Sequence, residues 1–544
     1  MRWLWLAALS SGTAWAGGAE LDVRGWVESD FRVRVSDLPA GAWHAPTGIQ
    51  KGVERFRNRA GGVLVAEGQS WLASVEGEFV LSAKPQAAGL GDLAHRPQVD
   101  PFWFELDEAA IEIWDAGVAG LDLKIGHQVV QWGAADQFNP TNTLNPENFE
   151  DPLKFGEQLP NTMVRADYSL GPTWTISGVL VPVFRPATLP STSSIGVSFT
   201  DRMPVIQDRV RQDLQAKQAL AADLGFPTIV DAVDLDLPPA TLNNMAGMIR
   251  VGGAIGMTDL ALSLYSGRTD MPQAVANDTR LERRSICHPM RPDSCIQGYM
   301  VTDSTLAYPR MHVAGLNAAG ELDVLSGIGG QPIGWRLEAA WVMPERTTIA
   351  IRNTNLDLGG LVQPEGEFAY GLGGERPNVV SDKPYAKWTL GLDYTIGKAL
   401  YLNAQWVHGM ADEFGQGDFI DPDFVTRAGG DGWEIRRLRT GDYVVLGTDI
   451  NLPRATLRLF SILDVSGYHR EDTAEPGSPP SITNFGPFSK NGFSAVLYPE
   501  LMVSLGDGLN WSVGTIQLFG AEHTKFGDPA AGGDLVFTKV RYDF

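Results

Sequence analysis

Polar and apolar residues alternate along the first and the last segments of the chain. From Leu21 to Val35, one face carries Leu21, Val23, Gly25, Val27, Phe31, Val33 and Val35, and the other is mostly charged. Val536, Thr538, Val540, Tyr542 and Phe544 share a face at the C-terminal end. A period of two predicts β-strands. Strands in globular proteins have typically about 5–6 residues, so these longer runs predict strands that cross a membrane at a tilt.

Sixteen further strand-like runs lie between these two segments. They span residues 56–67, 71–81, 108–115, 121–130, 163–170, 173–182, 246–256, 259–266, 310–317, 334–342, 386–396, 400–408, 442–450, 454–463, 494–503 and 510–519. Short turns alternate with long loops, which is typical of bacterial barrels with periplasmic turns and extracellular loops. The sequence therefore predicts an all-β fold, a transmembrane antiparallel β-barrel of about 18 strands. Because 310–317 is the weakest run, 16 strands is the alternative.

The N-terminal residues have the pattern of a signal peptide. Arg2 precedes the short apolar run Trp3–Leu9, and the small-residue site Ala14-Trp15-Ala16 follows. We expect cleavage after Ala16, with residues 1–16 as the signal peptide and 17–544 as one barrel domain in the outer membrane of a Gram-negative bacterium. The terminal Phe544 resembles the last residue of outer-membrane barrels, and this resemblance implies the barrel-assembly machinery as a partner.

If the apolar strand faces contact lipid, the opposite faces line the lumen. An Arg or Lys facing lipid at mid-depth costs about 2–4 kcal/mol, so the charged faces point inward. This parity predicts inward residues Arg24, Arg32, Arg34, Arg165, Arg250, Arg336, Arg458, Lys539, Arg541, Asp22, Glu28, Asp30, Glu338, Asp393 and Asp449. Two interpretations stay open: these charges line a selective pore, or they form salt bridges that make the barrel wall rigid.

Composition excludes several classes of function. With 43 Lys and Arg against 65 Asp and Glu, the chain lacks the basic surface that a nucleic-acid-binding protein needs. The signatures H-E-x-x-H and G-x-S-x-G are absent, and Gly391–Lys398 only imitates a P-loop. We therefore expect neither catalysis nor a cofactor. An alternative is an outer-membrane lipid-modifying enzyme, whose His, Ser and Asn or Asp would converge only in the fold.

Residues 411–424 hold the densest group of carboxylates. Asp412, Glu413, Asp418, Asp421 and Asp423 occur there without a basic residue. Such density suits Ca²⁺ or Mg²⁺, and an ion bound here would bridge to lipopolysaccharide at the outer-membrane surface. The spacing lacks the EF-hand pattern, so a solvated acidic loop without a metal is the favoured interpretation.

Residues 121–140 carry the most specific motif. Gly126, Gln128, Trp132, Gly133, Asn139 and Pro140 match a pattern G-R-Q-x-x-x-W-G followed by N-P. This pattern resembles the signature of a porin-like family of uncharacterised proteobacterial outer-membrane β-barrels, with His127 in the place of the family's Arg. The resemblance implies a porin-like protein and, as a partner, an inner-membrane exporter of hydrophobes and amphiphiles.

Two long loops are candidates for closing the lumen. Gly133 allows a sharp turn after the motif strand, and we expect loop 131–162 to fold inward and constrict the lumen. The alternative is an external loop anchored by Trp132. In loop 183–245, a helical pattern at 206–224 predicts either a plug or a helix on the outer rim. The favoured function is a channel for small or amphiphilic molecules, and a plugged structural or adhesin barrel is a further alternative.

Cys287 and Cys295 are expected to form a disulfide. They lie eight positions apart in an exported chain, where close pairs are usually oxidised. A metal site with His288 is the alternative, although it lacks an evident fourth ligand. Thiol titration of the folded protein should give no reactive thiol before reduction and two after it. Two reactive thiols without reductant would exclude the disulfide.

Overall fold

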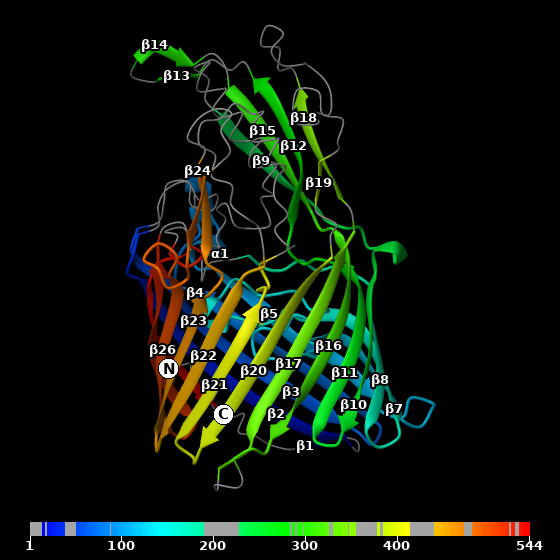
Figure 1. The fold of residues 1–544 in the computed structure, drawn as a ribbon. Coiled ribbons are helices and arrows are strands. Elements are labelled where there is room, and N and C mark those ends of the chain that lie inside the picture. Colours follow the sequence, from blue (N-terminus) through cyan, green and yellow to red (C-terminus); the bar gives the residue numbers. More distant parts are fainter. Residues whose placement is uncertain are drawn as a thin grey trace.

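The computed structural model describes residues 14–16, 19–37, 50–87, 89–189, 228–282, 286–288, 291–296, 299–325, 330–345, 347–354, 378–380, 384–413, 440–472, 481–521, 524–527 and 532–544. In this part of the chain, eighteen antiparallel strands close into one barrel (Figure 1). They are β2 (Ala19–Arg34), β3 (Gly52–Glu67), β4 (Trp71–Ser82), β5 (Phe102–Ile113), β6 (Leu121–Gln128), β7 (Asn161–Leu170), β8 (Trp174–Val181), β10 (Ala246–Ile255), β11 (Thr258–Arg268), β16 (Arg310–Leu322), β17 (Ile333–Pro344), β20 (Tyr385–Ile396), β21 (Leu400–His408), β22 (Asp442–Leu452), β23 (Ala455–Asp464), β26 (Ser494–Gly506), β27 (Leu509–Gly520) and β28 (Leu535–Asp543).

The strand number and the alternation of turns and loops confirm the prediction of an 18-stranded barrel. The first strand, β2, pairs with the last, β28, and this pairing closes the sheet. At the seam, Gly25 and Phe544 exchange two backbone hydrogen bonds of 2.9 Å each. The short strand β1 (Ala14–Ala16) pairs with the start of β2 at the end of the barrel that carries the short turns (Figure 1).

Several strands begin before their predicted start, and β5 does so by the largest number of residues. β5 starts at Phe102, whereas the sequence pattern placed its start at residue 108. In the register with β4, Glu76 pairs with Glu108 and Gly77 pairs with Leu106, so Asp107 is an extra residue. Such a bulge inverts the alternation within one strand. The outward positions are therefore even-numbered before Asp107 and odd-numbered after it. The first half of β5 does not continue the alternation of the second half, so the sequence pattern assigned it to a loop.

The outer face of the barrel carries a band of exposed apolar side chains. It includes Val27, Phe56, Leu64, Val75, Phe79, Phe104, Ile111, Ile125, Leu180, Ile249, Leu264, Trp341, Leu390, Trp406, Leu446, Leu459, Phe519 and Val540. A soluble protein rarely exposes so large a continuous apolar surface, whereas a membrane barrel requires it. In the described residues, no helix is long and apolar enough to span a membrane.

The long loops contain strands of their own, where the sequence pattern predicted only loops. β9 (Thr228–Asp236), β12 (Gln273–Glu282), β15 (Tyr299–Ala307), β18 (Thr347–Thr354) and β19 (Asn378–Val380) form a second sheet beyond the barrel rim (Figure 1). The pairs β13 (Ile286–His288) with β14 (Arg291–Ile296) and β24 (Tyr468–Asp472) with β25 (Ser481–Phe485) form two hairpins. The predicted helical segment 206–224 lies outside the described residues.

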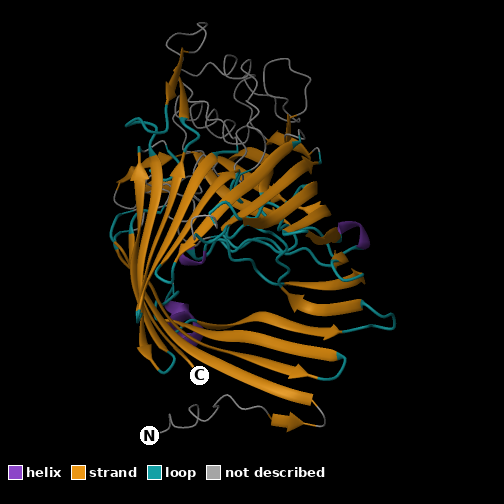
Figure 2. Ribbon diagram, turned by 60° about the horizontal axis from the view of Figure 1, so that its bottom comes forward, coloured by secondary structure: helices purple, strands orange, loops and turns teal. Residues whose placement is uncertain are grey.

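Helices are short and few in the described part of the chain. They are α1 (Arg96–Val99) and the 3₁₀ turns η1 (Leu90–Ala94), η2 (Pro152–Lys154) and η3 (Leu242–Asn244). Of these, η2 belongs to residues 129–160, which connect β6 to β7 and are called the lumen segment below. Loops run across the barrel interior in the tilted view of Figure 2.

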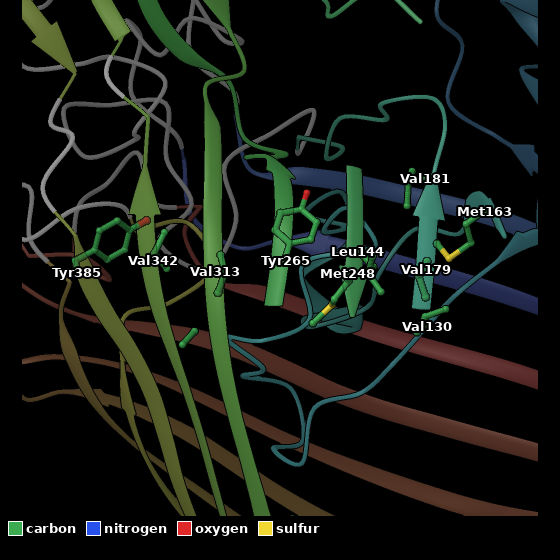
Figure 3. Packing of buried hydrophobic residues seen from close by; sticks show 11 residues of the cluster. Val130, Leu144, Met163, Val179, Val181, Met248, Tyr265, Val313, Val342 and Tyr385 are labelled. Atoms are coloured by element: carbon green, nitrogen blue, oxygen red, sulfur yellow. The ribbon is translucent and has the colours of Figure 1, made fainter. Parts of the chain in front are cut away.

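Two apolar clusters lie inside the barrel, and the lumen segment contributes to both. The first joins Val130 and Leu144 to Val179, Met248, Tyr265, Val313 and Val342 on successive strands (Figure 3). The second joins Phe138 to Val407, Tyr443, Val445, Ile462, Val496 and Ile516. Burial of apolar side chains contributes roughly 1.5–3 kcal/mol each, so these clusters hold the lumen segment against both sides of the barrel.

Candidate functional site

The lumen segment leaves the end of β6 in a conformation that asparagine side chains hold. The Asn145 side chain accepts a hydrogen bond from the Val130 N–H at 2.8 Å and donates one to the Leu159 carbonyl at 2.9 Å. Asn142 Oδ1 accepts from the N–H groups of Trp132 and Gly133, both at 2.9 Å. Buried backbone groups need such partners, and these two asparagines replace the strand ladder that ends at Gln128.

The two glycines of the motif stand where a side chain has no room. Gly126 has a φ of +137°, and a Cβ there would lie 2.2 Å from the carbonyl oxygen of Ala109. A Cβ on Gly133 would lie 2.7 Å from Glu338 Oε2. The motif glycines therefore permit close approach of the backbone to a neighbouring strand and to a carboxylate. Gln128 is fully buried and donates to the Met163 carbonyl at 3.3 Å.

Glu338 on β17 is the main anchor of the lumen segment. Its Oε2 accepts hydrogen bonds from the N–H groups of Ala134 at 2.8 Å and Ala135 at 3.1 Å. Its Oε1 accepts from the Thr141 N–H at 2.8 Å and the Thr141 hydroxyl at 2.7 Å. The side chain has no exposed surface. Because the segment surrounds the carboxylate with four donors, the polar face of β17 points into the lumen.

Asp136 extends this attachment over the next strands. Arg336 donates to its Oδ1 at 2.6 Å, and Asn403 and Gln405 donate to its Oδ2 at 2.9 and 3.1 Å. The Thr389 hydroxyl donates to the Phe138 carbonyl at 2.8 Å. One stretch of the lumen segment is thus bound to β17, β20 and β21.

A second stretch of the lumen segment is bound to β2 and β3. Asp151 accepts hydrogen bonds from Arg32 at 2.5 and 2.7 Å and from Arg55 at 2.8 Å. Glu150 pairs with Arg57 at 2.5 Å. Burial by itself would raise the pKa of the Asp151 carboxyl, but Arg32 and Arg55 hold this pKa well below its usual range. The lumen segment therefore crosses the barrel and is held at both ends by charged hydrogen bonds.

Most of the predicted inward arginines make ion pairs, and Arg24, Arg32, Arg336 and Arg458 pair with another predicted residue. Arg24 pairs with Asp22, Arg32 with Asp30, Arg34 with Glu54, Arg165 with Asp167, Arg336 with Asp393, Arg458 with Asp449 and Arg541 with Asp543. The Arg165 and Arg250 guanidinium groups lie 5.7 and 5.6 Å from the Trp132 ring. Glu28, Lys539 and Arg541 line a small cavity together with Arg59 and Glu78.

The sequence prediction missed several charged residues of this site. Arg55, Arg57 and Arg59 alternate along β3, and their period of two was the signal that would have found them. Glu150 and Asp151, the acidic partners of Arg55 and Arg57, belong to the lumen segment. No local signal indicates that these two carboxylates reach β3, because the lumen segment has no strand periodicity.

His127, which replaces the family's Arg, lies on the outward face of β6. Ile125, two residues earlier and therefore on the same face of the strand, is exposed, and no register shift occurs along β6. Nδ1 of His127 lies 3.3 Å from the Thr162 hydroxyl, and Nε2 lies 3.4 Å from Arg185. These contacts place His127 on the outer wall beside Arg185, which also donates to the Pro160 carbonyl at the end of the lumen segment.

The enzyme alternative requires a histidine beside an exposed serine. In the described part of the chain, the nearest arrangement is His408, whose Nδ1 lies 3.0 Å from Asp442 and whose Nε2 lies 3.0 Å from the Thr440 hydroxyl. Thr440 is a buried secondary alcohol. This hydrogen-bonded chain therefore does not supply the exposed serine that the alternative needs.

The acidic loop is not uniformly solvated, which corrects the favoured interpretation of its first two residues. Lys525 bonds Asp412 at 2.9 Å and Glu413 at 3.0 Å, and Asp412 is buried. Burial would lower the pKa of Lys525, but these two carboxylates raise it. Asp418, Asp421 and Asp423 lie outside the described residues. No metal-binding group of three or more ligands occurs within the described ranges.

The backbone register places Cys287 opposite Cys295 in the hairpin of β13 and β14. Their side chains lie outside the described part of the chain, so the disulfide stays a prediction.

Comparison with known proteins gives a family match over part of the chain. A model of a family described as a protein of unknown function (DUF1302) matches residues 110–227, which include the motif at 121–140. No curated protein matches.

Several solved structures resemble the chain at low identity. OccK9 (OpdG) of Pseudomonas aeruginosa is 10% identical, with a TM-score of 0.45, and the match covers 96% of this chain and 97% of that one. OccAB3 of Acinetobacter baumannii is 9% identical, with a TM-score of 0.43 and coverage of 96% and 99%. OmpF of Salmonella typhi is 9% identical, with a TM-score of 0.37 and coverage of 98% and 100%.

Loss of the Glu338 charge should release the adjoining stretch of the lumen segment. Glu338→Gln removes charged acceptors, and we expect a local loss of about 2–4 kcal/mol. Amide hydrogens of Ala134, Ala135 and Thr141 should then exchange at least about thirtyfold faster, since 1.4 kcal/mol is a factor of ten. Hydrogen exchange with mass spectrometry measures this, with Asp449→Asn as a control outside the segment. Equal protection in wild type and Glu338→Gln would contradict the anchoring role.

The contact between Glu147 and Asp270 should weaken as pH rises. Burial raises the pKa of Glu147 from 4.5 to about 8, and burial also raises that of Asp270, which accepts from the Glu147 N–H at 2.8 Å. The folded state then holds a proton that the unfolded state releases, so this stabilisation is complete below pH 4.5 and is lost as pH rises through about 8. Urea unfolding midpoints should fall over this range, and less steeply in Glu147→Gln. Parallel pH profiles of the two proteins would contradict the assignment.

Proposed function

We propose that this protein is an outer-membrane channel for small charged or zwitterionic solutes, constricted by the lumen segment. The exposed apolar band supports placement in a membrane. A barrel of 18 strands is wide enough to enclose an aqueous channel. The proposal includes no catalytic step.

The observation that carries the proposal is the attachment of one segment to different parts of the inner wall. Glu338 and Arg336 hold residues near 134–141, and Arg32 and Arg55 hold Asp151. A segment fixed in this way narrows the lumen without relying on its own secondary structure. Its described backbone groups are satisfied partly by Glu338 and Thr389 of the wall and partly by its own Asn142 and Asn145, which meets the condition for irregular backbone inside a membrane barrel.

Charges of both signs line the space beside the lumen segment. Arg59, Lys154, Lys539 and Arg541 share one small cavity with Glu28, Glu78 and Asp151. A solute that carries a positive and a negative group can form ion pairs first with one and then with another of these side chains as it passes. This supports small charged or zwitterionic solutes as the substrates of the channel. The apolar clusters of the inner wall are covered by the lumen segment. Passage of an amphiphile from an inner-membrane exporter, the alternative, therefore requires displacement of this segment.

Planar-bilayer recording tests the channel and its constriction. Glu338→Gln combined with Asp136→Asn weakens the anchors while keeping the chain length. Because a barrel of this size can hold a channel, we expect conductance to rise about twofold or more. Deletion of residues 134–160 should raise it further, and Ala404→Leu, on the exposed outer face of β21, should leave it unchanged.

Two results would contradict the proposal. Conductance that is equal in wild type and the anchor variant would exclude the constriction. Absence of conductance steps in every folded variant at all voltages would exclude the channel and favour a plugged structural barrel.

A further inference from the structure

Two arginines lie directly opposite each other on the outer face, at the loop ends of β11 and β16. The strand register pairs Arg268 with Arg310. Arg268 lies on the same face of β11 as Leu262 and Leu264, which are exposed apolar residues of the outer band. Tyr265, on the opposite face of β11, is buried inside the barrel. Like charges directly opposite on adjacent strands destabilise a sheet. Neither guanidinium has a carboxylate within 4.0 Å among the described residues.

The Arg268 side chain is held by uncharged hydrogen-bond acceptors, and the carboxylates of Asp236 and Glu345 act on it only from beyond 4.0 Å. Its Nη1 donates to the Tyr308 carbonyl at 2.6 Å, and its Nη2 donates to Asn244 at 2.7 Å. Its Nε is buried and has no hydrogen-bond partner. One of these carboxylates, Glu345, lies 3.3 Å from His312 Nε2. A positive site with a fixed orientation therefore stands at the loop rim of the outer wall.

An apolar hollow lies beside this pair, toward the middle of the barrel. The register aligns Val164, Leu180, Gly247, Ser266, His312 and Met343 in one row, and Ala166, Gly178, Ile249 and Leu264 in the next. All ten line the hollow. Small residues form its floor, and exposed Leu180, Ile249 and Leu264 form its sides. His312 follows Arg310 by two residues, roughly 7 Å along the strand.

The hollow is a groove on the outer wall, because the ten residues named above have the outward parity of their strands. Val179, Met248, Tyr265 and Val313 project from the same strands into the buried inner cluster (Figure 3). A ligand in the hollow therefore comes from the membrane side.

We propose that this surface binds a phosphorylated, acylated lipid of the outer leaflet, of the lipid A type. The phosphate would accept hydrogen bonds from Arg268 and Arg310, and an acyl chain would fill the hollow over Gly178 and Gly247. Charge complementarity supports this occupant, because a phosphate relieves the repulsion between the arginines. The inference rests on the proposed membrane location but not on conduction.

Native mass spectrometry of the purified full-length barrel tests the site. The probes are bis-phosphorylated lipid A, the same lipid without phosphates, and inorganic phosphate. Since hydrogen bonds between charged groups are stronger than those between neutral ones, wild type should bind the phosphorylated lipid at least about tenfold more tightly than the other lipid. Inorganic phosphate alone should not be retained.

Two variants separate the parts of the site, each with a matched control. Arg310→Gln should remove the preference for phosphate, whereas Arg454→Gln, at an exposed turn on the opposite rim, should keep it. Gly178→Leu should weaken binding of both lipids, because a Cβ there points into open space in the hollow. Ala404→Leu, on the exposed face of β21, should have no effect.

Equal affinity for the two lipids in wild type would overturn the phosphate site. Unchanged lipid binding in Gly178→Leu, with far-UV circular dichroism of a folded barrel, would overturn the acyl site. Bilayer conductance of these variants should equal that of wild type, so failure of the lipid site and failure of the channel are distinguishable.

Discussion

Satisfaction of backbone hydrogen bonds without water is the constraint on which this structure depends. Inside a membrane, each unsatisfied backbone group costs several kcal/mol. The eighteen strands meet this constraint by closing the sheet, with β28 paired to β2. The lumen segment meets it differently, through side chains. Glu338 accepts from Ala134, Ala135 and Thr141, and Asn142 and Asn145 accept from the backbone where the β6 ladder ends.

The same arrangement explains why the inner wall is both charged and apolar. Charged side chains such as Arg32 and Glu338 are buried against the lumen segment, where each has charged or hydrogen-bonding partners. Apolar side chains such as Tyr265 and Ile462 are buried by the same segment. A buried charge that loses its partner costs several kcal/mol, so the anchors and the segment depend on each other.

Local deviations limited the prediction of the fold. The extra residue Asp107 inverts the alternation of β5, and the first half of the strand was therefore assigned to a loop. The sheet of β9, β12, β15, β18 and β19 has no membrane face, so its strands do not carry the long amphipathic pattern used to find the others. Asp412 and Glu413 resembled a solvated loop because their partner Lys525 is distant in sequence.

The sequence by itself predicted the barrel, a number of about 18 strands and the alternation of faces wherever a strand has no bulge, because a period of two is a local property that membrane and lumen impose on the strands. It also marked Gly126 and Gly133, whose lack of a side chain the close packing requires. Only the tertiary structure decided which charges meet. Asp151 binds Arg32 across 119 positions, and Ala134 binds Glu338 across 204. Such contacts depend on the path of a segment without periodicity, and they follow from closure of the barrel around it.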